Sequence, residues 1–166
     1  MYRLVILGII AVTAVVADMD KNECRRLFHP HSMRCCKESS EVTEKIRKDD
    51  NFKECFDLPK DPVKCEHELC MAKKKGFATD DDKFDKAKFE EIVTKDIEDK
   101  DFLADIKKNC LDGDLENYGP PDFCDFIKMK HCMGLNMLNH CKEWNDSGDC
   151  NQLKSVVADC VKLISE

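Results

Sequence analysis

The stretch CDFIKMKHCMGLNMLNHCKEWNDSGDC, residues 124–150, decides how this chain can fold. It combines closely spaced cysteines with apolar residues at helical intervals, and no strand-like alternation is visible in it. The whole chain has 12 cysteines in 166 residues. No Cys-x-x-Cys pair occurs, so the spacing fits neither a zinc ribbon nor a thioredoxin-type redox site. The even number predicts six disulfides in an exported protein, formed by Cys24, Cys35, Cys36, Cys55, Cys65, Cys70, Cys110, Cys124, Cys132, Cys141, Cys150 and Cys160.

The first seventeen residues are typical of a secretory signal peptide. A basic residue precedes the uncharged apolar run Leu4–Val16, and Val15 and Ala17 occupy the −3 and −1 positions of a cleavage site before Asp18. A membrane anchor is the alternative, but this run is shorter than the roughly 20 residues that a membrane span needs. We therefore expect residues 1–17 to be a signal peptide and residues 18–166 to be one secreted, extracellular domain.

The acidic charge of the chain limits its partners. The formal net charge is −7 at pH 7, which argues against nucleic acid and against anionic membrane surfaces. After the signal peptide no stretch approaches membrane-spanning length. We expect no nucleic acid partner and no stable membrane insertion.

The segments between the cysteines predict helices. Gly and Pro are scarce, with 6 and 5 residues, and strand patterns are absent. Apolar residues spaced three and four apart predict an all-α, compact bundle of about six or seven helices. The candidate segments are 40–48, 61–76, 84–94, 102–110, 120–134, 135–144 and 150–164.

Capping residues suggest where several of these helices begin and end. Asp61 with Pro62 after it predicts one start, and Gly76 the matching end. The prolines at 120–121 predict another start, with an end near Gly134. The acidic run at 80–82 is expected to cap a helix N-terminus, where negative charge is favourable.

A domain of this size can bury a core without cross-links, so six disulfides need another explanation. One is a partly hollow interior, whose packing contributes less to stability. The other is durability in an extracellular fluid. Both stay open at the level of the sequence.

The cysteine spacing resembles that of the insect odorant-binding proteins. Four residues separate Cys65 from Cys70, and eight separate Cys141 from Cys150. With Cys110 between these pairs and additional cysteines around them, the pattern is most similar to the Plus-C subclass of this PBP/GOBP-type family. Cys124 leaves a second register open, because the interval from Cys110 to Cys124 suits the shorter spacing of the six-cysteine form.

The resemblance implies a disulfide pairing of first to third, second to fifth and fourth to sixth cysteine. On the Plus-C register the implied pairs are Cys36 (or Cys35) with Cys70, Cys65 with Cys141, and Cys110 with Cys150. Helical geometry separates Cys65 from Cys70 by about 140° around the axis, so these two are not expected to bond each other. The other six cysteines stay unassigned.

The resemblance also implies a function. Members of the family bind small hydrophobic molecules, such as odorants or pheromones, in an internal pocket and carry them through extracellular fluid such as sensillum lymph to a membrane odorant receptor. A secreted effector or inhibitor that acts through protein–protein contacts is the alternative. Candidate pocket residues, each of which could equally be ordinary core, are Phe77, Phe84, Phe89, Ile92, Phe102, Leu103, Ile106, Phe126, Met133, Met137, Leu138 and Trp144.

No pattern in the chain predicts catalysis. Gly-x-Ser-x-Gly and glycine-rich phosphate loops are absent, and no thiol stays free if all cysteines pair. His67, His131 and His140 lie near cysteines, but half-cystines cannot serve as thiolate ligands. The resemblance implies that such histidines could trigger ligand release as the pH falls; the alternative is that they are surface residues with no role. We expect no enzyme, no cofactor and no metal site. Asn145 begins an Asn-Asp-Ser sequon and is a candidate glycosylation site.

Overall fold

The computed structural model describes residues 21–145 and 147–165, and the all-α prediction is confirmed for them. The expected signal peptide and its cleavage site lie outside the described residues. Within the described part, β-structure is limited to isolated bridges, between Cys36 and Trp144 and between Ala78 and Phe84. The α-helical segments are α1 (Lys21–Cys24), α2 (Pro30–Met33), α3 (Lys37–Lys48), α4 (Lys53–Phe56), α5 (Glu66–Lys75), α6 (Lys86–Asp96), α7 (Lys100–Ile106), α8 (Asp125–Asn139) and α9 (Gly148–Ser165). Shorter turns of other helix types are η1 (Arg25–Phe28), η2 (Asp50–Phe52), the π-helical η3 (Lys107–Leu111) and η4 (Leu115–Tyr118).

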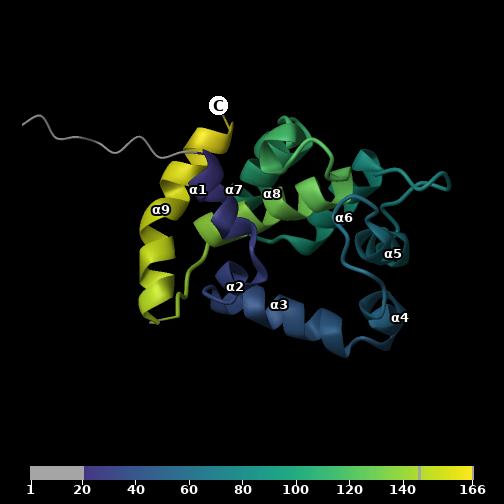
Figure 1. Ribbon diagram of the computed structural model, residues 1–166, viewed down its shortest axis with the longest axis horizontal. Coiled ribbons are helices and arrows are strands. Elements are labelled where there is room, and N and C mark those ends of the chain that lie inside the picture. The colour runs from purple at the N-terminus through teal and green to yellow at the C-terminus, as the bar shows by residue number, and fades with distance from the viewer. Residues whose placement is uncertain (1–20, 146, 166) are drawn as a thin grey trace, which may run out of the picture.

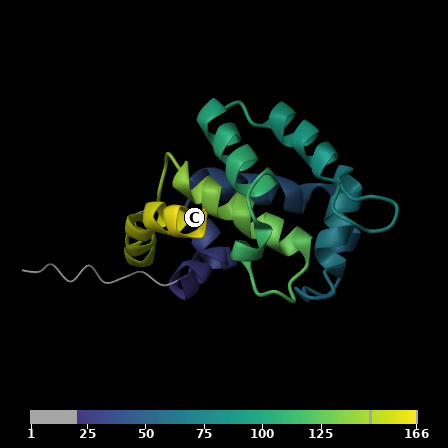
Figure 2. The ribbon, with the colours of Figure 1, turned by 90° about the horizontal axis from the view of Figure 1, so that it is seen from above.

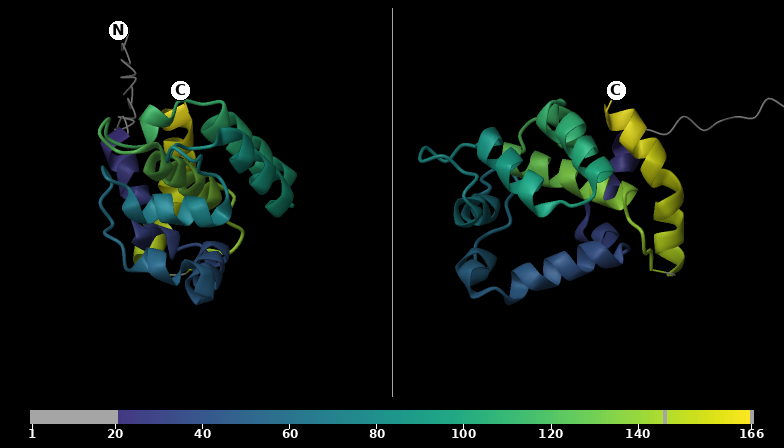
Figure 3. Two further views of the ribbon diagram at one scale, coloured as in Figure 1. Left: turned by 90° about the vertical axis from the view of Figure 1, so that its right-hand side faces the viewer. Right: turned by 180° about the vertical axis from the view of Figure 1, so that it is seen from behind.

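Helix α8 runs through the middle of the molecule (Figures 1 and 2). The N-terminal segment α1–α2 and helix α9 lie at one end of it, and α4 and α5 lie at the other. Helices α6 and α7 cover one side of α8 (Figure 2). The side and back views in Figure 3 place α3 below α8, joined to the rest at its two ends. Ser39 is the one fully buried residue of α3, so this helix contributes little to the core.

Helix α8 supplies more buried residues than any other described helix, and its length corrects one prediction. Eight of its residues are buried: Phe126, Ile127, Lys128, Met129, Cys132, Leu135, Asn136 and Leu138. The predicted end near Gly134 is wrong, because the helix continues to Asn139. A Cβ at Gly134 would lie 3.1 Å from the sulfur of Met33. The missing side chain therefore lets α2 approach α8, and the glycine serves packing instead of helix termination. The predicted start at 120–121 is also wrong, since Cys124 is the N-cap.

Helix α5 begins four residues later than the capping pattern predicts. The Asp61 carboxylate accepts hydrogen bonds from the backbone N–H groups of Val63 and Lys64, at 2.9 and 3.1 Å. That turn does not continue into a helix, because Cys65 has a left-handed backbone with φ 58°. The helix therefore starts at Glu66. It ends where predicted, at Gly76, which is also left-handed with φ 81°.

The acidic run at 80–82 does not cap a helix. Asp81 instead accepts a hydrogen bond from the Thr79 hydroxyl at 2.6 Å and pairs with Lys83 at 2.6 Å. Asp85 is the N-cap of α6, and its carboxylate accepts the Lys88 N–H at 2.9 Å. The prediction assigned the cap a few residues too early because several acidic residues precede α6.

All twelve cysteines are paired, as predicted, but the three pairs implied by the resemblance are wrong. Neither Cys36–Cys70, nor Cys65–Cys141, nor Cys110–Cys150 forms. The physical reason is the position of α8: its start lies against α5 and its middle against η3, whereas Cys141 and Cys150 follow its end, beside the N-terminal segment. The observed pairs are Cys24–Cys160, Cys35–Cys150, Cys36–Cys141, Cys55–Cys70, Cys65–Cys124 and Cys110–Cys132. Cys65 and Cys70 bond different partners, as helical geometry predicts.

These pairs divide into two sets. The inner set, in chain order, is Cys55, Cys65, Cys70, Cys110, Cys124 and Cys132, and its bonds join first to third, second to fifth and fourth to sixth. This is the pairing order that the resemblance implies, carried by a different choice of six cysteines. The outer set is nested, since Cys24–Cys160 encloses Cys35–Cys150, which encloses Cys36–Cys141. It joins residues before α3 to residues after α8.

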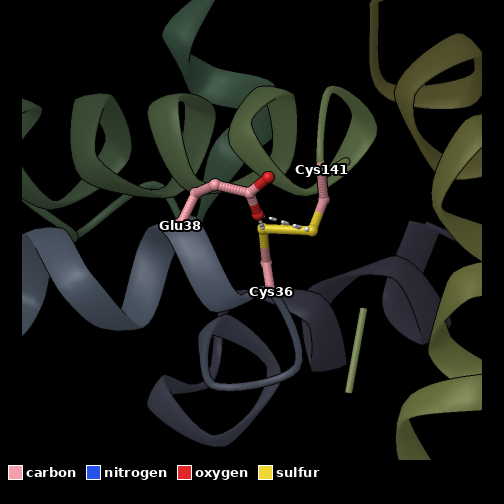
Figure 4. A group of neighbouring side chains, drawn as sticks. All are labelled: Cys36, Glu38 and Cys141. Carbon is pink, nitrogen blue, oxygen red and sulfur yellow. Dashed lines mark hydrogen bonds between the residues drawn. A yellow bond between two sulfur atoms is a disulfide. The ribbon is translucent and has the colours of Figure 1, made fainter. Parts of the chain in front are cut away.

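Glu38 holds the segment after α8 against the start of α3. One carboxylate oxygen accepts the backbone N–H groups of Lys142 and Glu143, both at 3.2 Å. The other oxygen points toward the disulfide between Cys36 and Cys141 and lies 3.0 Å from the Cys36 sulfur (Figure 4). A single side chain thus satisfies two loop N–H groups that would otherwise need water.

We expect Glu38→Ala to lower the free energy of unfolding of the oxidised protein by about 1 kcal/mol, because charge-assisted hydrogen bonds at a partly exposed site are lost. Urea denaturation followed by circular dichroism measures the change. Glu41→Ala is the matched control, because Glu41 is exposed on the same helix. Equal losses in the two variants would contradict the assignment.

Candidate functional site

A groove of about 500 Å³ lies between the N-terminal segment and α9. Leu27 of η1 is buried beneath it, and Leu153 and Val156 of α9 form its half-buried opposite wall. Most of the surface in the groove is apolar. Its size falls within the range of roughly 300–1,000 Å³ found for small-molecule sites. Figures 1 and 3 show α1 and α9 side by side at this end of the molecule.

Two disulfides of the outer set fix the width of the groove. Cys24–Cys160 joins α1 to the middle of α9, and Cys35–Cys150 joins the residues after α2 to the start of α9. The two chain segments therefore run in opposite directions along the groove. The ten residue steps from Cys150 to Cys160 span about 15 Å of helix, at about 1.5 Å per residue. The two bonds thus lie about 15 Å apart along α9.

The spacing of residues on α9 explains why they share one wall. Leu153, Val156 and Cys160 are three or four positions apart, and Gln152 is four before Val156, so the four residues occupy one side of the helix. Val157 and Ile164 are on the neighbouring face and are almost fully buried in the core. Helix α9 therefore uses one apolar stripe for packing and the adjacent residues for the groove.

Polar groups surround the apolar floor. Arg26, His29 and His31 line the groove from the N-terminal segment, and all three are exposed. The backbone between them is held by the Ser32 hydroxyl, which donates to the Arg26 carbonyl at 2.9 Å. The other polar lining residues are Glu23, Asp149 and Gln152.

The N-terminal wall is anchored to α8 through His131. The ring of Phe28, next to Leu27, stacks on the His131 ring with centroids 4.5 Å apart and planes 8° from parallel. The His131 Nδ1 lies 2.8 Å from the Tyr118 carbonyl oxygen, so we assign the ring proton to Nδ1. Burial lowers the pKa of His131, although the hydrogen bond to the Tyr118 carbonyl raises it in part. Burial also raises the pKa of the Tyr118 hydroxyl to about 12.

The lowered pKa of His131 predicts a loss of stability in acid. Because the folded pKa lies below the unfolded value of about 6.5, the folded state resists protonation that the unfolded state accepts. The contribution is full above the unfolded pKa and is lost as the pH falls toward the folded one. The variant His131→Phe keeps a ring against Phe28 but has no group that titrates. As the pH is lowered from about 7.5 to about 5, we expect its free energy of unfolding to fall less than that of the wild type.

Urea denaturation at each pH measures this difference. His31→Phe is the control, since His31 is exposed and should leave the wild-type slope unchanged. A His131→Phe slope identical to that of the wild type would show that this ring does not titrate as assigned.

None of the twelve candidate pocket residues lines the groove. Ile92 and Met137 are half-buried and belong to neither apolar cluster. The main cluster contains Phe77, Phe84, Phe89, Phe102, Leu103, Ile106, Met133, Leu138 and Trp144. Phe126 belongs to the second cluster, which Phe77 and Phe84 also contact. Phe77, Phe84, Phe89 and Phe126 form an aromatic group with ring centroids 5.2 to 6.1 Å apart.

Few features of the sequence indicate the groove. Its N-terminal wall comes from helical turns of four residues each, too short to show periodicity. The apolar stripe of α9 is the one local signal. It predicts that this face of the helix is packed, but it does not identify the segment that packs against it. The pairing of Cys24 with Cys160 would have located the site, and that pairing was unassigned.

The remaining histidines have structural neighbours. His140 Nε2 lies 2.7 Å from the Asp105 carboxylate. His67 and Glu68 are buried on α5, and Lys130 of α8 pairs with Glu68 at 2.9 Å. Burial raises the pKa of Glu68, but the charges of Lys130 and His67 and their contacts outweigh this and leave it below the usual range. His67 Nδ1 lies 3.1 Å from the Glu68 oxygen without hydrogen-bond geometry, so the polar contact between α5 and α8 here is the ion pair of Glu68 with Lys130.

Cys36, Glu38 and Cys141 are close enough to resemble a metal site, but the two sulfurs are bonded to each other (Figure 4). A disulfide offers no thiolate, so the oxidised protein cannot use them as metal ligands. The sequon residue Asn145 is half-buried, and its side-chain amide nitrogen donates to the Arg34 carbonyl. A glycan on Asn145 would occupy that same nitrogen. Glycosylation there stays a prediction.

Comparison with protein-family models, with curated proteins and with solved structures finds no match to this chain. None of the described helices is long and apolar enough to cross a membrane. The six disulfides are consistent with secretion.

Proposed function

We propose that this protein is a secreted carrier that reversibly binds small hydrophobic molecules, such as odorants or pheromones, and transports them through extracellular fluid to membrane receptors. The observation that carries the proposal is the pairing order of the inner disulfides, first to third, second to fifth and fourth to sixth. Six cysteines allow fifteen pairings, and the inner set has the one that the resemblance to insect odorant-binding proteins implies.

The groove supports the same proposal. Its apolar floor would remove a ligand's apolar surface from water, at about 25 cal/mol per Å² before the costs of association. The two flanking disulfides keep the walls in place without a ligand, so little conformational entropy is lost on binding. Binding of this kind needs no covalent step. With all twelve cysteines paired, no thiolate nucleophile is available, and we propose no enzyme activity.

A titration of the oxidised protein with the fluorescent hydrophobic probe N-phenyl-1-naphthylamine tests the carrier function. We expect saturable uptake, followed by displacement with medium-chain alcohols, aldehydes or carboxylates, because these compete for the same apolar surface. Reduced and alkylated protein is the control and should lose the signal. Absence of saturable uptake by the oxidised protein would overturn the proposal and favour the effector or inhibitor alternative.

Filling the groove tests its role in that uptake. We expect Val156→Trp to weaken probe binding about tenfold, because the larger side chain occupies the wall between Leu27 and Leu153. Val63→Trp is the matched control, since Val63 is 52% exposed and lies outside the groove. Unchanged binding by Val156→Trp would place the probe elsewhere, with the aromatic group around Phe84 as the next site to examine.

A further inference from the structure

We infer that the groove selects an amphipathic monoanion, with a carboxylate head on Arg26 and an unbranched apolar chain along Leu27, Leu153 and Val156. This inference rests on the proposed carrier function and adds the chemical class of the ligand. It starts from the one permanently charged cation among the lining residues.

Arg26 has an unused guanidinium at the edge of an apolar surface. Among the described residues its side chain takes part in no ion pair or hydrogen bond, although carboxylates are numerous in this acidic chain. Elsewhere on the described surface, lysines such as Lys37 and Lys107 pair with nearby glutamates at 3.1 and 3.0 Å. The planar guanidinium fork fits the two oxygens of one carboxylate. Arg26 is thus available to a ligand instead of to a neighbouring side chain.

His29 and His31 extend the same polar wall. Each imidazole carries at least one N–H donor in either protonation state. Both rings are exposed, line the groove, and form no hydrogen bond or ion pair with the described residues. A carboxylate on Arg26 therefore lies on the same wall as further donors.

The acidic residues of the groove restrict the ligand to a single negative charge. Glu23 lies in α1 on the same wall as Arg26, and Asp149 lies in the first turn of α9 on the opposite wall. The two carboxylates outnumber the single guanidinium of Arg26 by one, so a dianion would be repelled more than a monoanion. The charges thus favour a monocarboxylate over a phosphate or a dicarboxylate.

The disulfides limit the length of the ligand. The stretch of α9 between Cys150 and Cys160 is about 15 Å long, and both cysteines are covalently joined to the opposite wall. A medium-length, unbranched chain fits along this distance. Dodecanoate is therefore the probe of choice, and dodecanol is its uncharged analogue.

The experiment compares sodium dodecanoate with dodecanol as competitors for N-phenyl-1-naphthylamine on the oxidised protein. We expect Arg26→Gln to weaken dodecanoate binding about tenfold, as for loss of one charge-assisted contact, and to leave dodecanol binding unchanged. Arg47→Gln makes the same charge change at an exposed position on α3, outside the groove, and should leave both affinities unchanged.

Each other outcome has a defined meaning. If Arg26→Gln leaves dodecanoate binding at the wild-type level, or weakens both competitors equally, the head-group assignment is wrong while the carrier function stands. If Arg47→Gln weakens dodecanoate as much as Arg26→Gln does, the effect is one of overall charge and the assignment also fails. If the wild type takes up no probe at all, the carrier function fails first and this inference falls with it.

Discussion

The covalent attachment of α8 to the segments around it is the constraint on which the rest of the structure depends. Cys65–Cys124 fixes the start of α8 to the start of α5, and Cys110–Cys132 fixes its middle to η3. Cys55–Cys70 in turn joins α4 to α5. The three bonds therefore form an interlocked set, in which α4, α5, η3 and α8 are covalently linked and cannot separate from one another. Cross-links of this kind restrict the unfolded chain most when they close long loops, with typical contributions of about 2–4 kcal/mol each. The four-residue helices α1, α2 and α4 are far too short to form alone. Helix α4 is held by Cys55–Cys70 of the inner set, whereas α1 and α2 are held by Cys24–Cys160 and Cys35–Cys150 of the outer set.

Around the interlocked set, buried polar residues of α8 select one arrangement of the core. Asn136 is fully buried and accepts a hydrogen bond from the Asn109 side chain at 2.8 Å. Lys128 is 2% exposed and pairs with Glu116 at 2.7 Å. Because an unpaired amide or ammonium group in the core would be costly, these contacts disfavour other registers of η3 and η4 against α8. Tyr118 at the end of η4 then presents the carbonyl that orients His131, and His131 supports the wall of the groove through Phe28. The polar core and the candidate site are therefore physically connected.

The two disulfide sets have different consequences for function. The inner set holds the packed core, in which most of the candidate pocket residues are found. The outer set joins the two ends of the described chain and encloses a groove that ordinary packing did not fill. Two explanations were considered for the six disulfides, a partly hollow interior and durability in an extracellular fluid, and each now corresponds to one of the two sets. The inner set stabilises the packed core and so serves durability. The outer set keeps an apolar surface unfilled, and this surface lies at the periphery of the molecule instead of in its centre.

The sequence by itself determined the all-α class, the fact that every cysteine forms a disulfide, the end of α5 at Gly76 and the apolar stripe of α9. These are local properties, since helical periodicity and a left-handed glycine are encoded within a few neighbouring residues. Only the tertiary structure decided which cysteines meet, because two sets of six have spacings compatible with one pairing order and the choice depends on which helices lie side by side. It also decided that Gly134 admits Met33 instead of ending α8, and that short turns from the N-terminus complete a groove on α9. Such contacts join residues more than a hundred positions apart, as Cys24 and Cys160 are, and no local pattern records them.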